Sequence, residues 1–338
     1  MAGETVLVTG GSGYIGGWCI IALLNQGYTV RTTIRNLARE AEVRARIAKE
    51  APTDRLSVFA ADLLSDAGWD EAAAGCDYVL HVASPLGLGV SDPQTLIKPA
   101  REGAQRAIRA AIKAGAKRVV MTSSVAAVEP PGADMATVDE TSWTDPAAKG
   151  VSPYAQSKTL AERAAWELIA AEGGGVTTLA VVNPALVLGP VLGDDYSESL
   201  QVIERLLTGR VPGSPRLGFN LIDVRDVADL HLKAMLAPEA AGQRFIAATD
   251  FLWMAEIAQV LRARLGAKAS KVPKGKVPDF VLRLLALFDR DLTYVTPMLG
   301  VRRNFSSAKA QALLGWRPRP PEQIIVECAE SLIAHGVS

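Results

Sequence analysis

Cysteine and histidine are scarce in this 338-residue sequence, with three of each. The cysteines, Cys19, Cys76 and Cys328, are odd in number and widely spaced, which argues against a disulfide framework and fits a reducing compartment. The histidines are equally scattered and form none of the short spacings typical of a metal site. We therefore expect neither structural disulfides nor a bound metal.

An excess of charge of one sign is also missing, as are long apolar runs. The chain has 36 basic and 36 acidic residues, so the basic surface of a nucleic-acid-binding protein is not expected. Apolar stretches such as residues 175–188 are too short to span a bilayer, and the start of the chain lacks the pattern of a secretion signal. These features predict a cytoplasmic protein that binds neither nucleic acid nor membrane.

The sequence does contain a regular alternation of strand-like and helical segments. The strand-like runs lie at residues 6–9, 29–34, 56–60, 78–82, 118–122 and 177–182. Strands that alternate with longer helical patterns predict repeated βαβ units, and hence a Rossmann-type doubly wound α/β fold with a parallel sheet. Gly27 and Gly115 follow two of the helical segments, where each suits the left-handed residue at a helix end.

This alternation of strand-like and helical segments ends after about Asn183, where loops containing proline and glycine begin. Short helices and one or two short strands are expected beyond that point, and the basic segment 271–278 is expected to be a solvated loop. We therefore divide the chain into a Rossmann domain, residues 1–183, and a smaller lobe, residues 184–338. Some segments of the lobe are expected to return to the first domain.

A glycine-rich turn follows the first strand directly. Residues 9–16 read TGGSGYIG and satisfy two patterns, G-x-G-x-x-G from Gly11 and T-G-x-x-G-x-x-G from Thr9. Glycine allows the tight turn, the approach of the backbone to a pyrophosphate and close packing of the helix on the strand. The helix that follows would offer free N–H groups to the phosphates, although a glycine turn without a ligand is the alternative. The cofactor-binding residues expected here are Gly10, Gly13, Tyr14, Ile15 and Gly16.

The second strand carries information about the choice of cofactor. A site for NAD usually has a carboxylate near its end to bind the ribose 2′-hydroxyl, yet no acidic residue occurs between Glu4 and Glu40. Arg35 stands at that place, and a guanidinium can hold the 2′-phosphate of NADP through charge-assisted hydrogen bonds. We predict NADPH/NADP+ as the cofactor. The alternative for Arg35 is a surface cation beside Glu40.

Two further strand ends would contribute to the cofactor site. Asp62 and Leu63 follow the third strand, where Asp62 would accept a hydrogen bond from the adenine amino group and Leu63 would pack on the ring. A helix N-cap is the alternative for Asp62. Val82, Ala83 and Ser84 follow the fourth strand and would form a loop of small residues over the cofactor.

A candidate catalytic set lies in the middle of the chain. The fifth strand ends at Ser124, and Tyr154 and Lys158 open the next long helix on one face, one turn apart. The ordinary pKa of tyrosine is about 10, and a neighbouring ammonium would lower it, so that Tyr154 becomes a workable acid and base. Ser124 would hydrogen-bond the substrate oxygen beside the tyrosine. The alternative is a chance Tyr-x-x-x-Lys on an amphipathic surface helix.

With these motifs, the chain resembles the extended short-chain dehydrogenase/reductase superfamily, and within it the dihydroflavonol reductase and cinnamoyl-CoA reductase group. The resemblance covers nearly the whole chain and rests on the segments GYTVR, HVASP, SPYAQSKTLAERAAW, NPALVLGP, DVRDVA, FSS and LGW. These are residues 27–31, 81–85, 152–166, 183–190, 223–228, 305–307 and 314–316.

The resemblance implies hydride transfer from NADPH to a ketone or aldehyde, with Ser124, Tyr154 and Lys158 as the catalytic residues and Arg35 at the 2′-phosphate. It further implies that Asn183 and the residues after it, Pro184, Ala185 and Leu186, border the nicotinamide. The plant flavonoid enzymes place an asparagine a few residues beyond the serine. Residues 125–128 of this chain are apolar instead, and Glu129 and two prolines follow.

The substrate pocket is expected from residues 84–90, 126–131 and 185–200, which are mostly apolar, together with parts of the second lobe. Such a lining favours a hydrophobic or aromatic carbonyl compound. Two rival functions are a sugar-nucleotide epimerase or dehydratase on the same fold, which would need NAD and groups for a diphosphate, and a non-catalytic NADP-sensing regulator, which would lack the tyrosine and the lysine. A homodimer is compatible with the sequence, which does not determine the oligomeric state.

Overall fold

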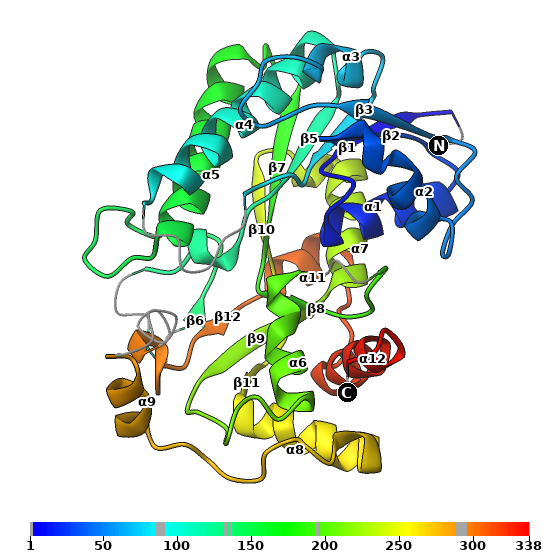
Figure 1. The fold of residues 1–338 in the computed structure, drawn as a ribbon. Coiled ribbons are helices and arrows are strands. Elements are labelled where there is room, and N and C mark those ends of the chain that lie inside the picture. The colour runs from blue at the N-terminus through cyan, green and yellow to red at the C-terminus, as the bar shows by residue number, and fades with distance from the viewer. Residues whose placement is uncertain are drawn as a thin grey trace.

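A seven-stranded parallel sheet forms the centre of the molecule, with strand order β10-β7-β5-β4-β1-β2-β3 (Figure 1). The computed structural model describes residues 3–85, 92–130, 134, 137–193, 197–287 and 296–337. The strands of the sheet are β1 (Thr5–Thr9), β2 (Thr29–Ile34), β3 (Leu56–Ala60), β4 (Tyr78–His81), β5 (Arg118–Thr122), β7 (Thr178–Pro184) and β10 (Gln243–Ala247). This arrangement confirms the predicted doubly wound α/β fold.

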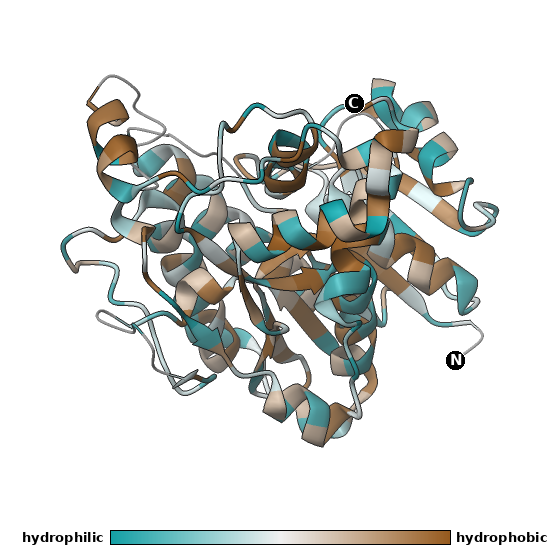
Figure 2. Cartoon of the chain, turned by 90° about the horizontal axis from the view of Figure 1, so that it is seen from below, coloured by the Kyte–Doolittle hydropathy of each residue, from teal (hydrophilic) through white to brown (hydrophobic). Residues whose placement is uncertain are grey.

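Helices cover both faces of the sheet because successive strand residues point to opposite sides. Val6 and Val8 belong to one hydrophobic cluster, with α1 (Tyr14–Asn25), α2 (Glu40–Ile47) and α7 (Val224–Leu236). Leu7 belongs to another, with α3 (Trp69–Ala73), α4 (Gln94–Lys113) and α5 (Pro153–Glu172). Most of the buried positions of the strands are accordingly apolar, and the strands form a largely brown centre between helices of mixed colour in Figure 2.

The predicted glycine helix ends are confirmed. Gly27 and Gly115 have φ of +85° and +72°, the left-handed region that costs glycine no steric penalty. A Cβ on Gly115 would meet no atom within 4 Å, and one on Gly27 would make only an ordinary contact of 3.6 Å. Backbone conformation, and not lack of space, therefore requires glycine at these two positions.

The order in which strands are added to the sheet reverses between β1 and β4. These two strands are neighbours, whereas β2 and β3, which come between them in the sequence, lie on the far side of β1. Open α/β sheets bind ligands at such a point, beyond the carboxyl ends of the strands. The glycine turn after β1 and the loop after β4 both lie at this edge.

The second part of the chain contains more strands than the sequence predicts. Five strands follow residue 184 in the described part of the chain, where one or two were expected, so this prediction was wrong. Three of them are only two or three residues long, and β9 and β10 carry the buried polar residues Asn220, Asp223 and Arg244, which obscure an apolar strand pattern. The strands outside the central sheet are β6 (Thr137–Val138), β8 (Leu186–Leu188), β9 (Gly218–Asp223), β11 (Phe251–Trp253) and β12 (Asn304–Phe305).

The remaining helices form most of the lower half of Figure 1. Strands β11, β9 and β8 make a small sheet that packs with α6, α8 and α12 around a third hydrophobic cluster. The helices are α6 (Gln201–Leu207), α8 (Met254–Leu265), α9 (Asp279–Leu285), α11 (Ala308–Leu314) and α12 (Pro321–Ala334). Short 3-10 helices are η1 (Leu37–Arg39), η2 (Val125–Ala127), η3 (Glu198–Leu200), η4 (Pro238–Ala240), η5 (Gly266–Ala269) and η6 (Thr296–Met298).

Two segments beyond residue 183, α7 and β10, belong to the layers of the central sheet. The division of the chain at residue 183 into two domains stays a prediction. The basic segment 271–278 is mostly exposed, although Val272 is buried and Lys276 forms a β-bridge with Ser214.

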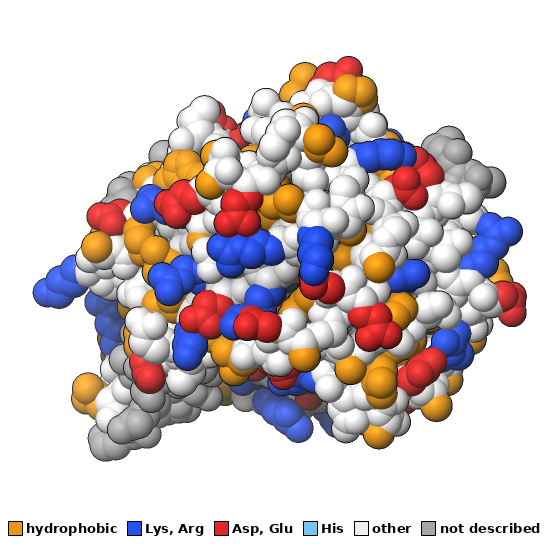
Figure 3. All heavy atoms as spheres, turned by 90° about the horizontal axis from the view of Figure 1, so that it is seen from above, with side chains coloured by type: hydrophobic (Ala, Val, Ile, Leu, Met, Phe, Trp, Pro, Cys, Tyr) orange, Lys and Arg blue, Asp and Glu red, His pale blue; other side chains and the backbone are white. Residues whose placement is uncertain are grey.

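Acidic and basic side chains are interspersed over the face drawn in Figure 3. In the described parts of the chain, every helix is too short or too polar to cross a membrane.

Candidate active site

The glycine turn leaves the first turn of α1 open to a ligand. Gly13 is the N-cap residue of α1, and no side chain hydrogen-bonds to the N–H groups that begin the helix. Gly10 has a φ of +76° and lies against the loop after β4, because its Cβ would be 3.0 Å from the Cα of Ala83. A Cβ on Gly16 would be 2.4 Å from the carbonyl oxygen of Gly10, so only glycine lets the helix pack this close.

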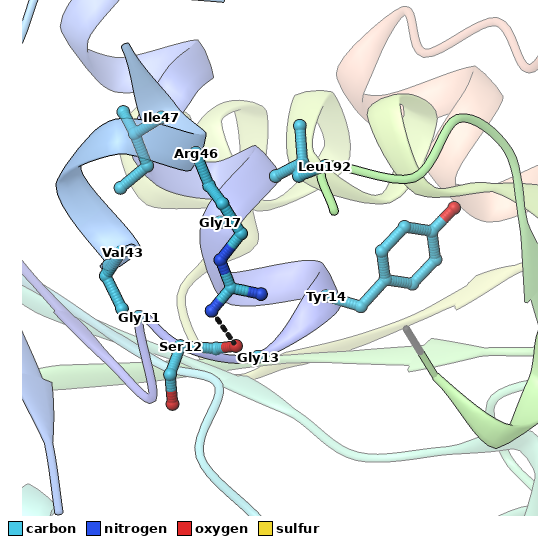
Figure 4. A pocket seen from close by; sticks show the side chains of 9 residues that line it. All are labelled: Gly11, Ser12, Gly13, Tyr14, Gly17, Val43, Arg46, Ile47 and Leu192. Atoms are coloured by element: carbon cyan, nitrogen blue, oxygen red, sulfur yellow. Dashed lines mark hydrogen bonds between the residues drawn. The ribbon is translucent and has the colours of Figure 1, made fainter. Parts of the chain in front are cut away.

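Tyr14 and Ile15 occupy the first turn of α1. Ile15 packs against the cluster on the α1 face of the sheet. The Tyr14 side chain packs against that cluster and also against the cluster of the second lobe, and its ring points away from Ser12 (Figure 4). Burial raises the pKa of the Tyr14 hydroxyl well above its usual value. The Tyr14 ring therefore connects the two halves of the molecule, and contact of this turn with the cofactor stays a prediction.

Thr9 fixes the loop after β4. Its hydroxyl oxygen accepts hydrogen bonds from the backbone N–H groups of Val82 and Ala83, each at 3.0 Å, and lies 3.0 Å from Nδ1 of His81. Burial, together with the smaller effect of the Lys158 charge, lowers the pKa of His81 to about 3, so the imidazole is neutral. Ser84 follows in the same loop and is partly buried. The loop of small residues is therefore anchored to the end of β1.

Arg35 lies just beyond the end of β2 and is exposed. It forms no hydrogen bond or ion pair with the described residues. Glu40, its expected surface partner, pairs instead with Arg44 at 2.8 Å. The guanidinium of Arg35 is thus available to an anionic ligand.

A second arginine near the glycine turn was missed from the sequence. Arg46, on α2, donates a hydrogen bond of 3.4 Å to the carbonyl oxygen of Ser12 and pairs with Glu42 at 3.2 Å (Figure 4). It lines a small pocket with residues of the turn and of the loop after β8. The signal for Arg46 in the sequence was its place on the buried side of a helix, three positions after Val43.

Asp62 and Leu63 form a turn after β3. The Asp62 carboxylate accepts a hydrogen bond of 2.8 Å from the N–H of Leu64, and no helix begins there, so the residue is not a helix N-cap. The Leu63 side chain packs against α4, since a Cβ on Gly103 would lie 2.4 Å from it. Their contact with an adenine ring stays a prediction.

Ser124 lies at the end of the segment after β5, as the N-cap residue of η2. Its hydroxyl oxygen accepts a hydrogen bond of 3.1 Å from the N–H of Ala126, and the side chain is almost buried. The neighbouring Ser123 hydroxyl is buried and has no partner among the described residues.

Tyr154 and Lys158 begin α5, which Ser152 caps by accepting a hydrogen bond from the N–H of Ala155. The ammonium of Lys158 lies 5.8 Å from the centre of the Tyr154 ring. Burial raises the pKa of Tyr154, against a hydrogen bond from Ser124 that lowers it. The sequence predicted a lowered pKa for Tyr154, and the structure differs because desolvation by burial outweighs the hydrogen bond from Ser124. Burial also lowers the pKa of Lys158 to about 8.

The end of β7 and the residues after it approach the same place. Asn183 is fully buried, and its amide nitrogen donates a hydrogen bond of 3.2 Å to the carbonyl oxygen of Ser124. Pro184 ends β7, and Ala185 and Leu186 are partly exposed after it. Of the predicted substrate pocket, residues 86–90, 131 and 194–196 lie outside the described residues.

The chain matches the model of the NAD dependent epimerase/dehydratase family over residues 6–248. The chain belongs to this family. It is 41% identical over 263 residues to cinnamoyl-CoA reductase 2 of Arabidopsis thaliana, with 77% of each chain covered. It is 36% identical over 268 residues to dihydroflavonol 4-reductase of Zea mays, with 77% of this chain and 74% of the relative covered.

Among solved structures, the fold is similar to that of the yeast methylglyoxal/isovaleraldehyde reductase Gre2 complexed with NADPH. The TM-score is 0.81 at 26% identity, with 98% of each chain covered. These similarities confirm the resemblance to the extended short-chain dehydrogenase/reductase superfamily and its dihydroflavonol and cinnamoyl-CoA reductase group.

Proposed function

We propose that this protein uses NADPH to reduce hydrophobic or aromatic ketones or aldehydes to alcohols, with Tyr154 as the general acid. The observation that carries the proposal is the grouping of Ser124, Tyr154 and Lys158 beyond the carboxyl ends of the central strands, where the glycine turn also lies. Relatives named as cinnamoyl-CoA and dihydroflavonol reductases support a carbonyl substrate.

The chain is an NADPH-dependent oxidoreductase. Its relatives are reductases, and Gre2, which shares its fold, was solved with NADPH. The enzyme class and the cofactor predicted from the sequence are therefore confirmed.

The residues present fit this cofactor. The open N-terminus of α1 would bind the pyrophosphate, and the close contacts of Gly10 and Gly16 give the backbone room to approach it. Arg35 and Arg46 would offer positive charge to the 2′-phosphate. When bound, NADPH supplies the hydride, and the protein supplies placement and the proton.

The catalytic residues have separate roles in orienting the substrate oxygen and in transferring the proton. The Ser124 hydroxyl would hydrogen-bond the substrate oxygen and orient it toward Tyr154. Because burial raises its pKa, Tyr154 is protonated at neutral pH, as a proton donor must be. Lys158, whose pKa is about 8, is mostly charged at pH 7 and would stabilise the phenolate that remains after proton transfer.

The two rival functions have less support. A sugar-nucleotide epimerase would need tightly held NAD, yet no carboxylate stands near the end of β2 and Arg35 is available there. A non-catalytic NADP-sensing regulator would not need Tyr154 and Lys158 on one face of a capped helix. We also propose a cytoplasmic location, since Cys19, Cys76 and Cys328 are buried and unpaired.

A substrate panel tests the proposal. NADPH oxidation is followed with matched aromatic or branched ketones and aldehydes, with short polar aldehydes, and with aromatic acyl-CoA thioesters. We expect higher kcat/KM for the bulky apolar carbonyl compounds, because the predicted pocket is mostly apolar. Equal efficiency across the apolar and polar carbonyl compounds would contradict the apolar pocket, and turnover of the thioesters alone would assign a different substrate class.

A further inference from the structure

A buried ion pair lies one helical turn behind the catalytic lysine. Glu162, on α5, is completely buried and pairs with Arg244 of β10 at 2.6 Å between Oε1 and Nε. Its other oxygen accepts a hydrogen bond of 2.9 Å from the amide of Asn183. A buried ion pair is weak evidence for stability alone, because desolvation of two charges offsets their attraction. The position of this pair, one helical turn from Lys158, therefore points to a functional role.

The pair is tied to the segment that carries Ser124. Asn183 bridges the Glu162 carboxylate and the carbonyl oxygen of Ser124, and both partners are acceptors, so the amide nitrogen must face them. Arg244 also donates to the carbonyl oxygen of Ala127, at the end of η2. Both ends of the turn after Ser124 are thus held by one set of charged and amide groups.

Arg244 is itself fixed in place. Its guanidinium donates to the carbonyl oxygens of Glu140 and Ser142, at 3.0 and 2.7 Å, and stacks on the ring of Trp143 at 3.7 Å. An arginine restrained on every side holds its carboxylate partner in one position. Glu162 therefore has little freedom to turn toward or away from Lys158.

The titratable groups that interact with Lys158 lie on α5 and β4, and Arg244 of β10 pairs with one of them. On α5 itself, Glu162 stabilises the ammonium, while Tyr154 is protonated and neutral at pH 7. On β4, His81 is neutral because burial lowers its pKa to about 3. On β10, Arg244 is the buried cation that pairs with the carboxylate of Glu162. Removal of the Glu162 charge would leave Arg244 without its carboxylate partner and Lys158 without the negative charge that stabilises its ammonium.

We propose that Glu162, Arg244 and Asn183 form a positioning network that keeps Lys158 charged and holds the backbone of Ser124 in place for proton transfer. This inference rests on the proposed function, since it assigns a task relative to the catalytic set. The two tasks are separable: the Glu162 carboxylate acts on the charge of Lys158, and Asn183 acts on the position of Ser124.

The test is the pH dependence of kcat/KM for carbonyl reduction by the full-length enzyme. In the wild type, activity should fall as the pH rises through about 8, where Lys158 loses its proton. In Glu162→Gln this fall should move to lower pH by about one unit or more, because an opposite charge is lost beside a buried ammonium. In Asn183→Ala the fall should stay in place while kcat drops. Glu167→Gln, at an exposed position of the same helix, is the matched control and should keep the wild-type profile.

A wild-type pH profile in Glu162→Gln together with a wild-type kcat in Asn183→Ala, with NADPH binding intact, would overturn the proposal. If Glu162→Gln does not fold, Glu162→Asp is measured instead; a smaller shift of the same sign supports the network, and an unchanged profile overturns it. Tyr154→Phe is assayed in parallel. If Tyr154→Phe keeps a tenth or more of wild-type kcat, the proposed function fails and the network with it. If Tyr154→Phe loses turnover while the Glu162 and Asn183 variants behave as the wild type, only the network is wrong.

Discussion

Single charged residues are proposed to set the choice of cofactor and the protonation state of the active site. Arg35 has no partner among the described residues, whereas Lys158 lies in a buried environment that brings its pKa to about 8. An exposed cation without a partner can bind a phosphate without first breaking an ion pair. A buried lysine with this pKa is mostly charged near neutrality and loses its charge just above it.

The choice between NADPH and NADH tests the role of Arg35. Loss of a charge-assisted hydrogen bond costs about 1.5 to 3 kcal/mol, so a preference for NADPH of about tenfold or more in kcat/KM is expected. Arg35→Ala should remove most of this preference by weakening NADPH while leaving NADH nearly unchanged. Lys49→Ala, which removes an exposed cation after α2, should keep the wild-type ratio. A wild-type ratio in Arg35→Ala would refute its assignment to the 2′-phosphate.

Sequence motifs predict site residues only when each residue acts within a local pattern. Tyr154 and Lys158 are four residues apart on one helix, and Arg35 follows a recognisable strand. Glu162, Arg244 and Asn183 come from three separate elements, and their contacts depend on the order of the strands in the sheet. The raised pKa of Tyr154 could not be predicted either, because it depends on burial by distant segments.

At the scale of elements, the packing of α1 on the end of β1 gives the glycine turn its shape. Gly16 and Gly17 are adjacent on α1, but their surroundings differ. A Cβ on Gly16 would meet the backbone oxygen of Gly10 at 2.4 Å, whereas one on Gly17 would meet the Cδ1 methyl of Leu192 at 2.8 Å. A methyl group at the end of a side chain can move aside more easily than a backbone carbonyl can.

This difference predicts unequal effects of two alanine substitutions. Gly16→Ala should raise the Kd for NADPH by about tenfold or more, since overpacking typically costs about 1–3 kcal/mol and here displaces the turn itself. Gly17→Ala should change the Kd several-fold less. Titration of protein fluorescence with NADPH measures both, and equal effects would show that the close approach of α1 does not shape the cofactor site.

At the scale of the whole molecule, the two halves of the chain must stay aligned so that the hydride and the proton reach the same carbonyl group. Tyr14 packs against the clusters of both halves, and the indole N–H of Trp18, also on α1, donates a hydrogen bond of 3.1 Å to the carbonyl oxygen of Pro190. The glycine turn and the loop after β8 are thus tied through one helix.

The first six strands of the central sheet could be predicted because short strand-like runs alternate with longer helical patterns in this part of the chain. The seventh, β10, carries Arg244 as its second residue and follows a long segment outside the sheet, so its pairing with β7 was not foreseen. The short strands of the second lobe depend on tertiary contacts, and the local sequence gives little sign of them.

Substitution of Tyr154 by phenylalanine tests the central claim most directly, because it removes one hydroxyl and little else. The kcat of Tyr154→Phe for NADPH-dependent reduction of the best carbonyl substrate is compared with that of the wild type, and the Kd for NADPH is measured on both proteins. General acid catalysis contributes about a hundredfold or more, so kcat should fall by at least that factor while the Kd stays within about twofold. If the variant retained a tenth or more of wild-type kcat, Tyr154 would not be the proton donor.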